Sequence, residues 1–309
     1  MSVAELHTGK VLKATRKTYH VAVGERVIEC TVRGKLTVDD NDYTAVKAGD
    51  DVKISLVSDA AGAIEEILPR RSWLSRSIES RAYQEHIIAA NIDQILIILS
   101  TRKPEFKSGL LDRYLVIAEK NRLKALVCIN KIDLARPEYF QPYREYYSRL
   151  KYPVFLTSAA TGEGIAQLKR RLTHKVTALV GQSGVGKSSL ICAIRPDLDI
   201  KIQSVSERTR KGLHTTTAVQ LFPIGKEGFV ADTPGIRELG FWGIYKADLP
   251  EYFIEFSRYI SRCSFGDCTH IHEPGCAVIA AVEEGEIFPE RYENYVNIYD
   301  SLKSAHYER

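Results

Sequence analysis

The sequence predicts a multidomain protein in which an N-terminal OB-type β-barrel, a central α/β domain and a mainly helical C-terminal domain follow one another. A chain of 309 residues is too long for one ordinary hydrophobic core. After Pro69 the apolar pattern changes from short alternating segments to buried runs between helical segments, and three of the six cysteines fall within residues 263–276. We therefore place the domains at 1–70, 71–240 and 241–309.

The N-terminal domain is predicted from five short alternating or β-branched segments, separated by turn residues such as Gly24 and Gly49. Strands of this number and length favour a small barrel of the OB type, a fold that often holds nucleic acid. Residues 1–68 carry 9 Lys/Arg and 11 Asp/Glu, so their net charge of −2 leaves open whether the barrel binds RNA or only packs on its neighbour. The predicted strands are Lys10–Ala14, Tyr19–Val23, Arg26–Leu36, Asp51–Leu56 and Ala63–Leu68.

The central domain alternates apolar runs with segments of helical spacing, which predicts a parallel sheet with helices on both faces. Pro69, Arg70 and Arg71 mark a linker before it. The strands are expected at Ile92–Leu99, Ala125–Ile129, Val154–Leu156, Val176–Val180, Ala218–Phe222 and Phe229–Ala231, and the helices at Leu110–Asn121, Ile165–Leu172 and Lys187–Ile194.

A phosphate-binding loop is predicted between the strand that ends at Val180 and the helix that starts at Lys187, because the intervening residues fit the pattern G-x-x-x-x-G-K-[ST]. Backbone amides would cradle the phosphates, Lys187 would reach the β and γ oxygens as a catalytic group, and Ser188 would ligate Mg²⁺. The pattern alone does not separate ATP from GTP. The predicted contacts are Gly181, Gln182, Ser183, Gly184, Val185, Gly186, Lys187, Ser188 and Ser189.

Guanine is predicted as the base from the motif Asn130-Lys131-Ile132-Asp133, which directly follows a predicted strand. A carboxylate at Asp133 can accept hydrogen bonds from N1 and N2 of guanine, groups that adenine does not offer. N-K-x-D is short and by itself often a surface loop. The segment Thr157-Ser158-Ala159 strengthens the interpretation. It lies at the end of another predicted strand, where Ser158 and Ala159 could contact the base through their backbone.

Two further segments are expected to complete a magnesium site. Asp232-Thr-Pro-Gly235 ends a predicted strand, where Asp232 can hold the Mg²⁺ shell and the amide of Gly235 can meet the γ-phosphate, although a simple Pro-Gly turn is the alternative. The basic, aperiodic segment 208–217 has the composition of a loop ordered by γ-phosphate and Mg²⁺. One of Thr215, Thr216 and Thr217, of which we choose Thr216, would ligate the metal.

The order of these motifs predicts a circular permutation. In an ordinary GTPase the phosphate loop comes first and the guanine motif near the end, whereas here they begin at 181 and 130. The ends of a doubly wound domain often lie close together, so a permutation keeps the site while it moves the termini. The segment after Gly235 then leads directly into the C-terminal domain, to which it could pass the nucleotide state.

These motifs together resemble the circularly permuted bacterial GTPases of the RsgA family, also called YjeQ or YloQ, over the whole chain. The resemblance implies hydrolysis of GTP to GDP and phosphate, stimulated by the small ribosomal subunit, and a role in late maturation of that subunit. Its rRNA, GTP and GDP would be the partners, with Mg²⁺ bound together with GTP and one structural Zn²⁺. The first domain would be an OB-fold RNA- or ribosome-binding domain.

The cysteine cluster also fits the family as C-x4-C-x-H-x5-C. Three thiolates and one imidazole suit a closed tetrahedral structural zinc site; four unliganded side chains are the alternative. His272 is a rival ligand, and the family spacing selects His270. The predicted zinc ligands are Cys263, Cys268, His270 and Cys276, and the remaining cysteines, which are expected in the core, are Cys30, Cys128 and Cys192.

Hydrolysis should be slow in isolation, because Ile236 stands where many GTPases carry a water-orienting glutamine. The resemblance points to His214 as the catalytic group that orients the water, and a solvated loop histidine is the alternative. A nucleotide-switched RNA-binding module with incidental hydrolysis is the second function considered. Asn130 and Asp133 argue against an ATP-dependent kinase.

Charge and composition restrict the setting. Residues 91–240 carry 24 Lys/Arg and 14 Asp/Glu, or +10, which favours a polyanionic partner, although a positive face that only aids solubility fits equally well. Residues 241–309 carry 6 Lys/Arg and 12 Asp/Glu, for a net charge of −6. No run at Met1–Lys10 has signal-peptide length, and the six cysteines are too sparse for a disulfide framework. We expect a monomeric cytoplasmic protein without membrane association.

Overall fold

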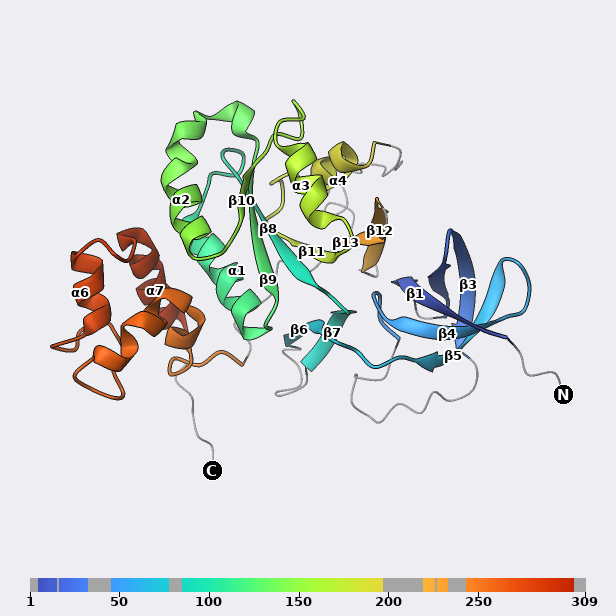
Figure 1. Ribbon diagram of the computed structural model, residues 1–309, viewed down its shortest axis with the longest axis horizontal. Helices are drawn as coiled ribbons and strands as arrows, with labels where there is room; N and C mark the ends of the chain where they lie inside the picture. The colour runs from blue at the N-terminus through green and yellow to red at the C-terminus, as the bar shows by residue number, and fades with distance from the viewer. Residues whose placement is uncertain are drawn as a thin grey trace, which may run out of the picture.

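The computed structural model shows three bodies in a row, with the barrel at one end, the central α/β domain in the middle and the helical C-terminal domain at the other end (Figure 1). The structure describes residues 5–15, 17–32, 46–77, 85–196, 219–225, 227–232 and 243–302. Backbone pairings run without a break through eleven strands, in the order β10-β9-β8-β11-β13-β12-β1-β2-β3-β5-β4. Within this described part no helix has the length and apolar character needed to span a bilayer.

The N-terminal strands close into a barrel, as predicted. Strand β1 pairs with both β2 and β4, while β3 and β5 run parallel, so the circuit is β1-β2-β3-β5-β4 and back to β1. Fully buried aliphatic side chains such as Val11, Val21 and Ile54 fill its interior. The OB-type barrel is thereby confirmed. Its strands are β1 Leu6–Ala14, β2 Tyr19–Val23, β3 Arg26–Val32, β4 Asp51–Leu56 and β5 Ala61–Ile67.

The linker predicted at Pro69, Arg70 and Arg71 contains no strand and is followed by a hairpin of two strands, β6 (Trp73–Ser77) and β7 (Glu85–Ala90), which pair antiparallel. Its inward side chains, Leu74 and Ala89, are fully buried against the core of the central domain. Strand β6, with the sequence WLSRS, has only two adjacent apolar residues and shows no alternating pattern, and the sequence prediction missed both strands.

The central sheet is mixed rather than purely parallel, which corrects the prediction. Five strands are parallel, but the edge strand β12 pairs antiparallel with β13 because the turn between Ile224 and Gly228 is too short for a crossover. The strands are β8 Gln94–Ser100, β9 Lys124–Asn130, β10 Val154–Leu156, β11 Val176–Val180, β12 Gln220–Ile224 and β13 Gly228–Asp232.

Helices cover both faces of this sheet, as predicted. Alternate residues of β8 enter two cores: Ile95 and Ile97 pack with helices α1 and α2, while Leu96 and Ile98 pack with α3 and α4. Helix α2 was not predicted, because its sequence QPYREYYSR holds no aliphatic residue and is anchored by two buried tyrosines. The helices are α1 Ser108–Lys120, α2 Gln141–Arg149, α3 Ile165–Leu172 and α4 Lys187–Ile194, with short 3-10 turns η1 Ile132–Leu134 and η2 Pro137–Phe140.

The C-terminal domain is helical and packs on α1. Aromatic rings dominate its core, where Phe253 and Phe256 lie 5.0 and 4.8 Å from the ring centre of Tyr295. At the boundary, the buried Arg291 bridges Glu255 of this domain and Asp112 of α1. The elements are η4 Leu249–Tyr252, η5 Ile254–Arg258, η6 Ile260–Arg262, α6 Ala277–Glu283 and α7 Pro289–Ser301.

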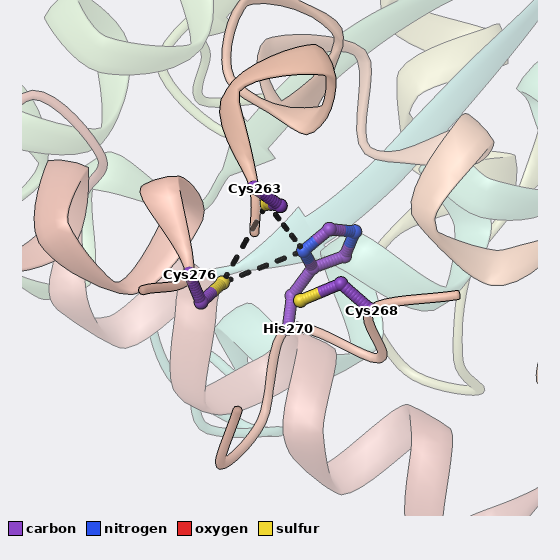
Figure 2. A group of neighbouring side chains, drawn as sticks. All are labelled: Cys263, Cys268, His270 and Cys276. Atoms are coloured by element: carbon purple, nitrogen blue, oxygen red, sulfur yellow. Dashed lines mark hydrogen bonds between the residues drawn. The ribbon is translucent and has the colours of Figure 1, made fainter. Parts of the chain in front are cut away.

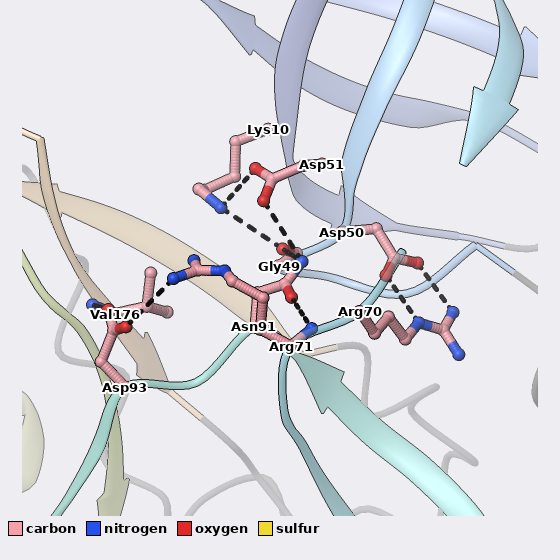
Figure 3. A network of polar contacts seen from close by, with 9 residues as sticks. All are labelled: Lys10, Gly49, Asp50, Asp51, Arg70, Arg71, Asn91, Asp93 and Val176. Carbon is pink, nitrogen blue, oxygen red and sulfur yellow. Dashed lines mark hydrogen bonds and ion pairs between the residues drawn. The ribbon is translucent and has the colours of Figure 1, made fainter. Parts of the chain in front are cut away.

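A polar junction fixes the barrel on the central domain (Figure 3). The Asn91 side chain donates to the Gly49 carbonyl at 3.1 Å and accepts from the Arg71 amide at 2.8 Å. Gly49 has φ +94°, and a Cβ there would lie 2.0 Å from the Ala90 carbonyl oxygen, so only glycine allows this approach. At the edge of the central sheet, Lys13 of β1 also pairs with Gln220 of β12, which joins the sheet to the barrel.

Candidate nucleotide site and metal centre

The predicted nucleotide motifs meet at one edge of the central sheet. Five parallel strands end there, and the register places Asn130 beside Ser100 and the backbone of Asp232 beside Leu179. Ligands of open α/β sheets bind at this carboxyl-terminal edge. The motif order along the chain differs from that of an ordinary GTPase, yet among the described residues the fold brings together the motifs that begin at 130, 157 and 181.

The phosphate-loop motif forms a tight turn that leads into α4. Gly181 has φ +149°, and a Cβ there would lie 2.2 Å from the Ile98 carbonyl oxygen, while Gly186 has φ +98°. Both glycines are therefore required by the close approach of neighbouring strands. Lys187 Nζ lies over the loop and donates to the carbonyls of Gly181 at 2.8 Å and Gln182 at 2.9 Å. The loop residues 183, 184 and 189 are exposed, and 188 is half-buried.

Asn130 joins the predicted guanine loop to the phosphate loop. Its side-chain amide donates to the Val185 carbonyl at 2.9 Å, and its oxygen accepts from the Ala159 amide and the Thr157 hydroxyl, both at 3.2 Å. The residue is 1% exposed, so all these contacts are shielded from water. A Cβ at Gly186 would lie 2.5 Å from Asn130 Nδ2, which explains why the phosphate loop has glycine there. One buried side chain thus fixes three loops.

Lys131 supports the same junction from the solvent side. It adopts a left-handed backbone with φ +63°, and its ammonium group donates to the Gly184 carbonyl at 2.5 Å and to the Lys103 carbonyl. Partial burial lowers the pKa of Lys131, against the opposing influence of Asp133. The aliphatic stem of this lysine therefore spans the space between the predicted guanine loop and the predicted phosphate loop.

Asp133 is exposed and oriented by Ser158. The Ser158 hydroxyl donates to Asp133 Oδ1 at 2.5 Å and accepts from the Thr161 amide at 3.1 Å. This arrangement holds a carboxylate at the surface of the site, where it can accept hydrogen bonds from two adjacent N–H groups of a flat ring.

The remaining predicted nucleotide contacts are only partly visible. Asp232 ends β13 at the level where the phosphate loop begins, and its backbone position is described. His214, Thr216 and Gly235 lie outside the described residues.

Sequence reasoning missed the loop that follows β8. The Thr101 hydroxyl donates to the Lys131 carbonyl at 2.5 Å, its amide donates to the Asn130 carbonyl at 3.0 Å, and the Lys103 carbonyl accepts from the Lys131 ammonium. The loop carries no recognisable motif. Its position after a parallel strand was the one signal that could have placed it at the site.

The predicted zinc ligands come together in the C-terminal domain (Figure 2). The ligand atoms of Cys263, Cys268, His270 and Cys276 all lie within 4.8 Å of one another. His270 Nδ1 is 3.6 Å from Cys263 Sγ and 3.5 Å from Cys276 Sγ, and those two sulfurs are 4.0 Å apart. Tetrahedral zinc with ordinary bond lengths would require edges of about 3.5 Å (S–N) and about 3.8 Å (S–S), so the atoms of Cys263, His270 and Cys276 fit zinc, and Cys268 Sγ lies within 4.8 Å of them as the fourth donor.

Hydrogen bonds brace the loop that carries these ligands. The Tyr292 hydroxyl donates to the His270 carbonyl at 2.8 Å, and the Glu273 carboxylate accepts from the Thr269 amide at 2.8 Å. Burial raises the pKa of Cys268 to about 12, so its thiolate needs a cation beside it. His272 is exposed and outside the cluster, in agreement with the choice of His270. Cys30 and Cys128 are buried as expected, and Cys192 is half-buried.

The comparisons with known proteins agree with this geometry. The sequence model of the RsgA GTPase family matches residues 67–242. The chain is 42% identical over 299 residues to a Gemmatimonas aurantiaca protein named small ribosomal subunit biogenesis GTPase RsgA, covering 96% of this chain and 97% of the relative. A Thermotoga maritima protein of the same name is 38% identical, with 97% of this chain and 95% of the relative covered.

Solved structures give the same result. The crystal structure of YjeQ from Thermotoga maritima superposes with a TM-score of 0.78 at 36% identity, covering 96% of this chain and 99% of that one. The crystal structure of YloQ, described as a circularly permuted GTPase, gives 0.74 at 32% identity, covering 96% and 95%. Because family, relatives and folds agree over nearly the whole chain, this protein belongs to the RsgA GTPase family.

Proposed function

We propose that this protein hydrolyses GTP to GDP and phosphate in late maturation of the small ribosomal subunit, and that the subunit stimulates the reaction. The observation that carries the proposal is the buried Asn130, whose side chain joins the base-reading loop to the phosphate loop. The relatives' names, which specify small ribosomal subunit biogenesis, supply the process. We further propose that the protein acts as a cytoplasmic monomer, with domains at 1–70, 71–240 and 241–309.

In the proposed site, the chain holds the triphosphate by its backbone and by the side chain of Lys187. Amides of residues 181–189 would donate to phosphate oxygens, and Lys187 would exchange its present carbonyl partners for the β and γ oxygens. Hydroxyl and carboxylate oxygens from Ser188, Thr216 and Asp232 form a donor set that suits Mg²⁺, which when bound neutralises charge on the β- and γ-phosphates.

Base selection is assigned to Asp133. Replacement of Asp133 by Asn should weaken GDP binding about 100-fold, because one of two charge-assisted hydrogen bonds becomes a clash between donors. Isothermal calorimetry of parent and D133N with GDP measures this loss. Exposed Glu138 lies just beyond the loop, and E138Q serves as a matched control that should bind GDP like the parent. Equal affinity of the parent for ADP and GDP would contradict the assignment.

The water-orienting role is proposed for His214. His214→Ala should lower subunit-stimulated turnover at least tenfold while GTP affinity stays within about twofold, because a general acid–base or orienting group contributes about 10²–10⁴ to rate and little to ground-state binding. Single-turnover phosphate release with small subunits gives the rate, and nucleotide titration gives the affinity. An unchanged stimulated rate would remove His214 from the mechanism.

The decisive test of function is GTP turnover with and without purified small subunits. Strong stimulation supports a subunit-activated GTPase. A low rate that subunits do not change would instead favour a nucleotide-switched RNA-binding module with incidental hydrolysis. This alternative is considered because Ile236 stands where many GTPases carry the glutamine that orients the attacking water. Cosedimentation with subunits in GDP and in a GTP analogue shows whether the nucleotide controls docking in either case.

A further inference from the structure

The edge of the central sheet opposite the nucleotide site carries a row of exposed cations, which we call the basic rim: Arg71, Arg122, Lys124, Arg171 and Lys175. Strands β8, β9 and β11 begin at this edge, and the β6–β7 hairpin lies on the same side (Figure 1). We propose that the basic rim is a surface that binds the phosphates of RNA. This inference rests on the proposed function, since it names a second place where the ribosomal substrate would be held.

The rim is continuous across the starts of two strands. Gln94 at the start of β8 pairs in register with Lys124 of β9, and its side-chain amide donates to the Arg171 carbonyl at 3.2 Å. The backbone at Lys124 and that at Arg171 therefore both adjoin one buried glutamine, although they are 47 positions apart in the sequence.

The rim also reaches the barrel junction. Asp93 accepts from the Val176 amide at 2.7 Å, and Lys175 precedes that residue. The same carboxylate lies 3.8 Å from the Arg71 guanidinium, whose side chain is 66% exposed (Figure 3). An elongated anionic ligand that contacts Lys175 on the central domain could therefore also reach Arg71 at the barrel junction.

The rim backbone is anchored while its side chains face water. The Lys175 carbonyl accepts from the Phe229 amide at 2.8 Å, which fixes the turn that leads out of α3. Within the described ranges, the side chains of Arg122, Lys124, Arg171 and Lys175 make neither ion pairs nor hydrogen bonds. Such charges are available to an external anion.

Helix stability does not account for this distribution. Cations in the last turn of α3 complement its dipole, and this would explain Arg171. It does not explain Lys175, which follows the helix, or Lys124, which starts a strand. Residues 164–175 contain four Lys/Arg and no Asp/Glu, and the five rim cations outnumber the neighbouring carboxylates of Asp93, which faces Arg71, and Glu227, which lies 3.7 Å from His174.

RNA fits this surface better than an anionic membrane does. Proteins that lie on membranes insert apolar side chains beside their cations. The exposed large hydrophobic residues of the described chain do not include any in the segments that form the rim, 119–124 and 169–176. A hydrophilic cationic surface is typical of contact with a phosphate backbone.

The test compares two double variants in binding to small subunits at 50 to 200 mM salt, in a GTP analogue. The rim variant is Lys124→Gln with Arg171→Gln; the control removes the same charge from exposed positions of α2 as Arg144→Gln with Arg149→Gln. In a plot of the logarithm of the binding constant against the logarithm of the salt concentration, the loss of two phosphate contacts should make the slope shallower by about two. The ratio of parent affinity to variant affinity should therefore fall about tenfold between 50 and 200 mM salt. The control should keep the parental slope. Denaturation midpoints check that both variants fold.

The outcomes separate the two proposals. If the parent binds subunits but the rim variant has the same salt slope as the parent, the basic rim is not the contact. The same conclusion follows if the control variant changes the salt slope as much as the rim variant does. If the parent does not bind subunits at all, the proposed function fails, and the rim is then tested by the same slope on protein-free small-subunit rRNA. Loss of binding to phosphatidylserine vesicles with unchanged RNA binding would overturn the assignment in favour of a membrane.

Discussion

Replacing Arg291 with methionine is expected to remove about 3–5 kcal/mol from the free energy of unfolding of the C-terminal domain. The Arg291 guanidinium is fully buried, donates to Glu255 Oε1 and Asp112 Oδ1 at 2.5 Å each, and lies 4.6 Å from the ring centre of Phe253. Methionine would fill much of the volume but leave two buried carboxylates without a cation. Denaturant unfolding followed by near-ultraviolet circular dichroism of the aromatic core measures the loss.

The pH dependence of that loss identifies its cause. Burial raises the pKa of Asp112, and Arg291 is the largest influence that opposes this rise. Without Arg291 the folded-state pKa should rise further above the unfolded value of about 4, so the folded variant binds more protons than the unfolded chain does. The loss in the free energy of unfolding that Arg291→Met causes should therefore be smaller at pH 5 than at pH 8. A deficit that does not change with pH would point to packing instead.

Arg113 provides a matched control on the same pair of helices. Its guanidinium donates to the Ser301 hydroxyl at 2.9 Å, and this contact is exposed. Arg113→Met should change the unfolding free energy by less than about 0.5 kcal/mol, as expected for a surface substitution. A double variant in which Glu255→Gln accompanies Arg291→Met should recover part of the loss, because one uncompensated charge is removed. Equal effects of Arg113→Met and Arg291→Met would refute the burial argument.

The sequence predicted correctly those elements whose sequence pattern lies within the element itself or next to it. Helices α3 and α4 match their predicted ranges, because each combines an apolar face with a glycine immediately before it. Motif residues such as Asn130 lie at strand ends, where the parallel arrangement makes their convergence predictable without knowledge of the loops. Four strands, at Tyr19–Val23, Asp51–Leu56, Val154–Leu156 and Val176–Val180, have the predicted bounds. The bounds of the other strands differ by one to four residues, and residues 33–36 of the predicted strand Arg26–Leu36 lie outside the described residues.

The elements that the sequence did not predict depend on distant partners. Tyr147 anchors α2 by donating to Asp112 at 2.7 Å, which no pattern within QPYREYYSR indicates. Arg291 resembles any surface cation of a helix until the carboxylates from two other elements surround it. The roles of His214 and Thr216 stay predictions, because both lie outside the described residues.

Loss of one zinc ligand is expected to unfold the C-terminal domain. Structural zinc contributes about 10–16 kcal/mol in small zinc domains, more than most domains have in total stability. His270 is 2% exposed and its Nδ1 faces two thiols, whereas His272, two positions on, is exposed. His270→Ala should therefore reduce bound zinc from one equivalent to nearly none, as measured by elemental analysis of the purified chain.

His272→Ala is the matched control and should keep one equivalent of zinc and the parental unfolding transition. Limited proteolysis should cleave the His270→Ala variant within residues 243–302 and leave the His272→Ala variant intact there, because the cluster ties the loop that follows η6 to the start of α6. GDP binding measured on the same samples reports whether the central domain remains folded. Retention of zinc by His270→Ala, or loss of zinc from His272→Ala, would show that the cluster seen in the structure is not the metal site. A C-terminal domain that stays intact without zinc would show that the aromatic core around Tyr295 suffices to keep it folded.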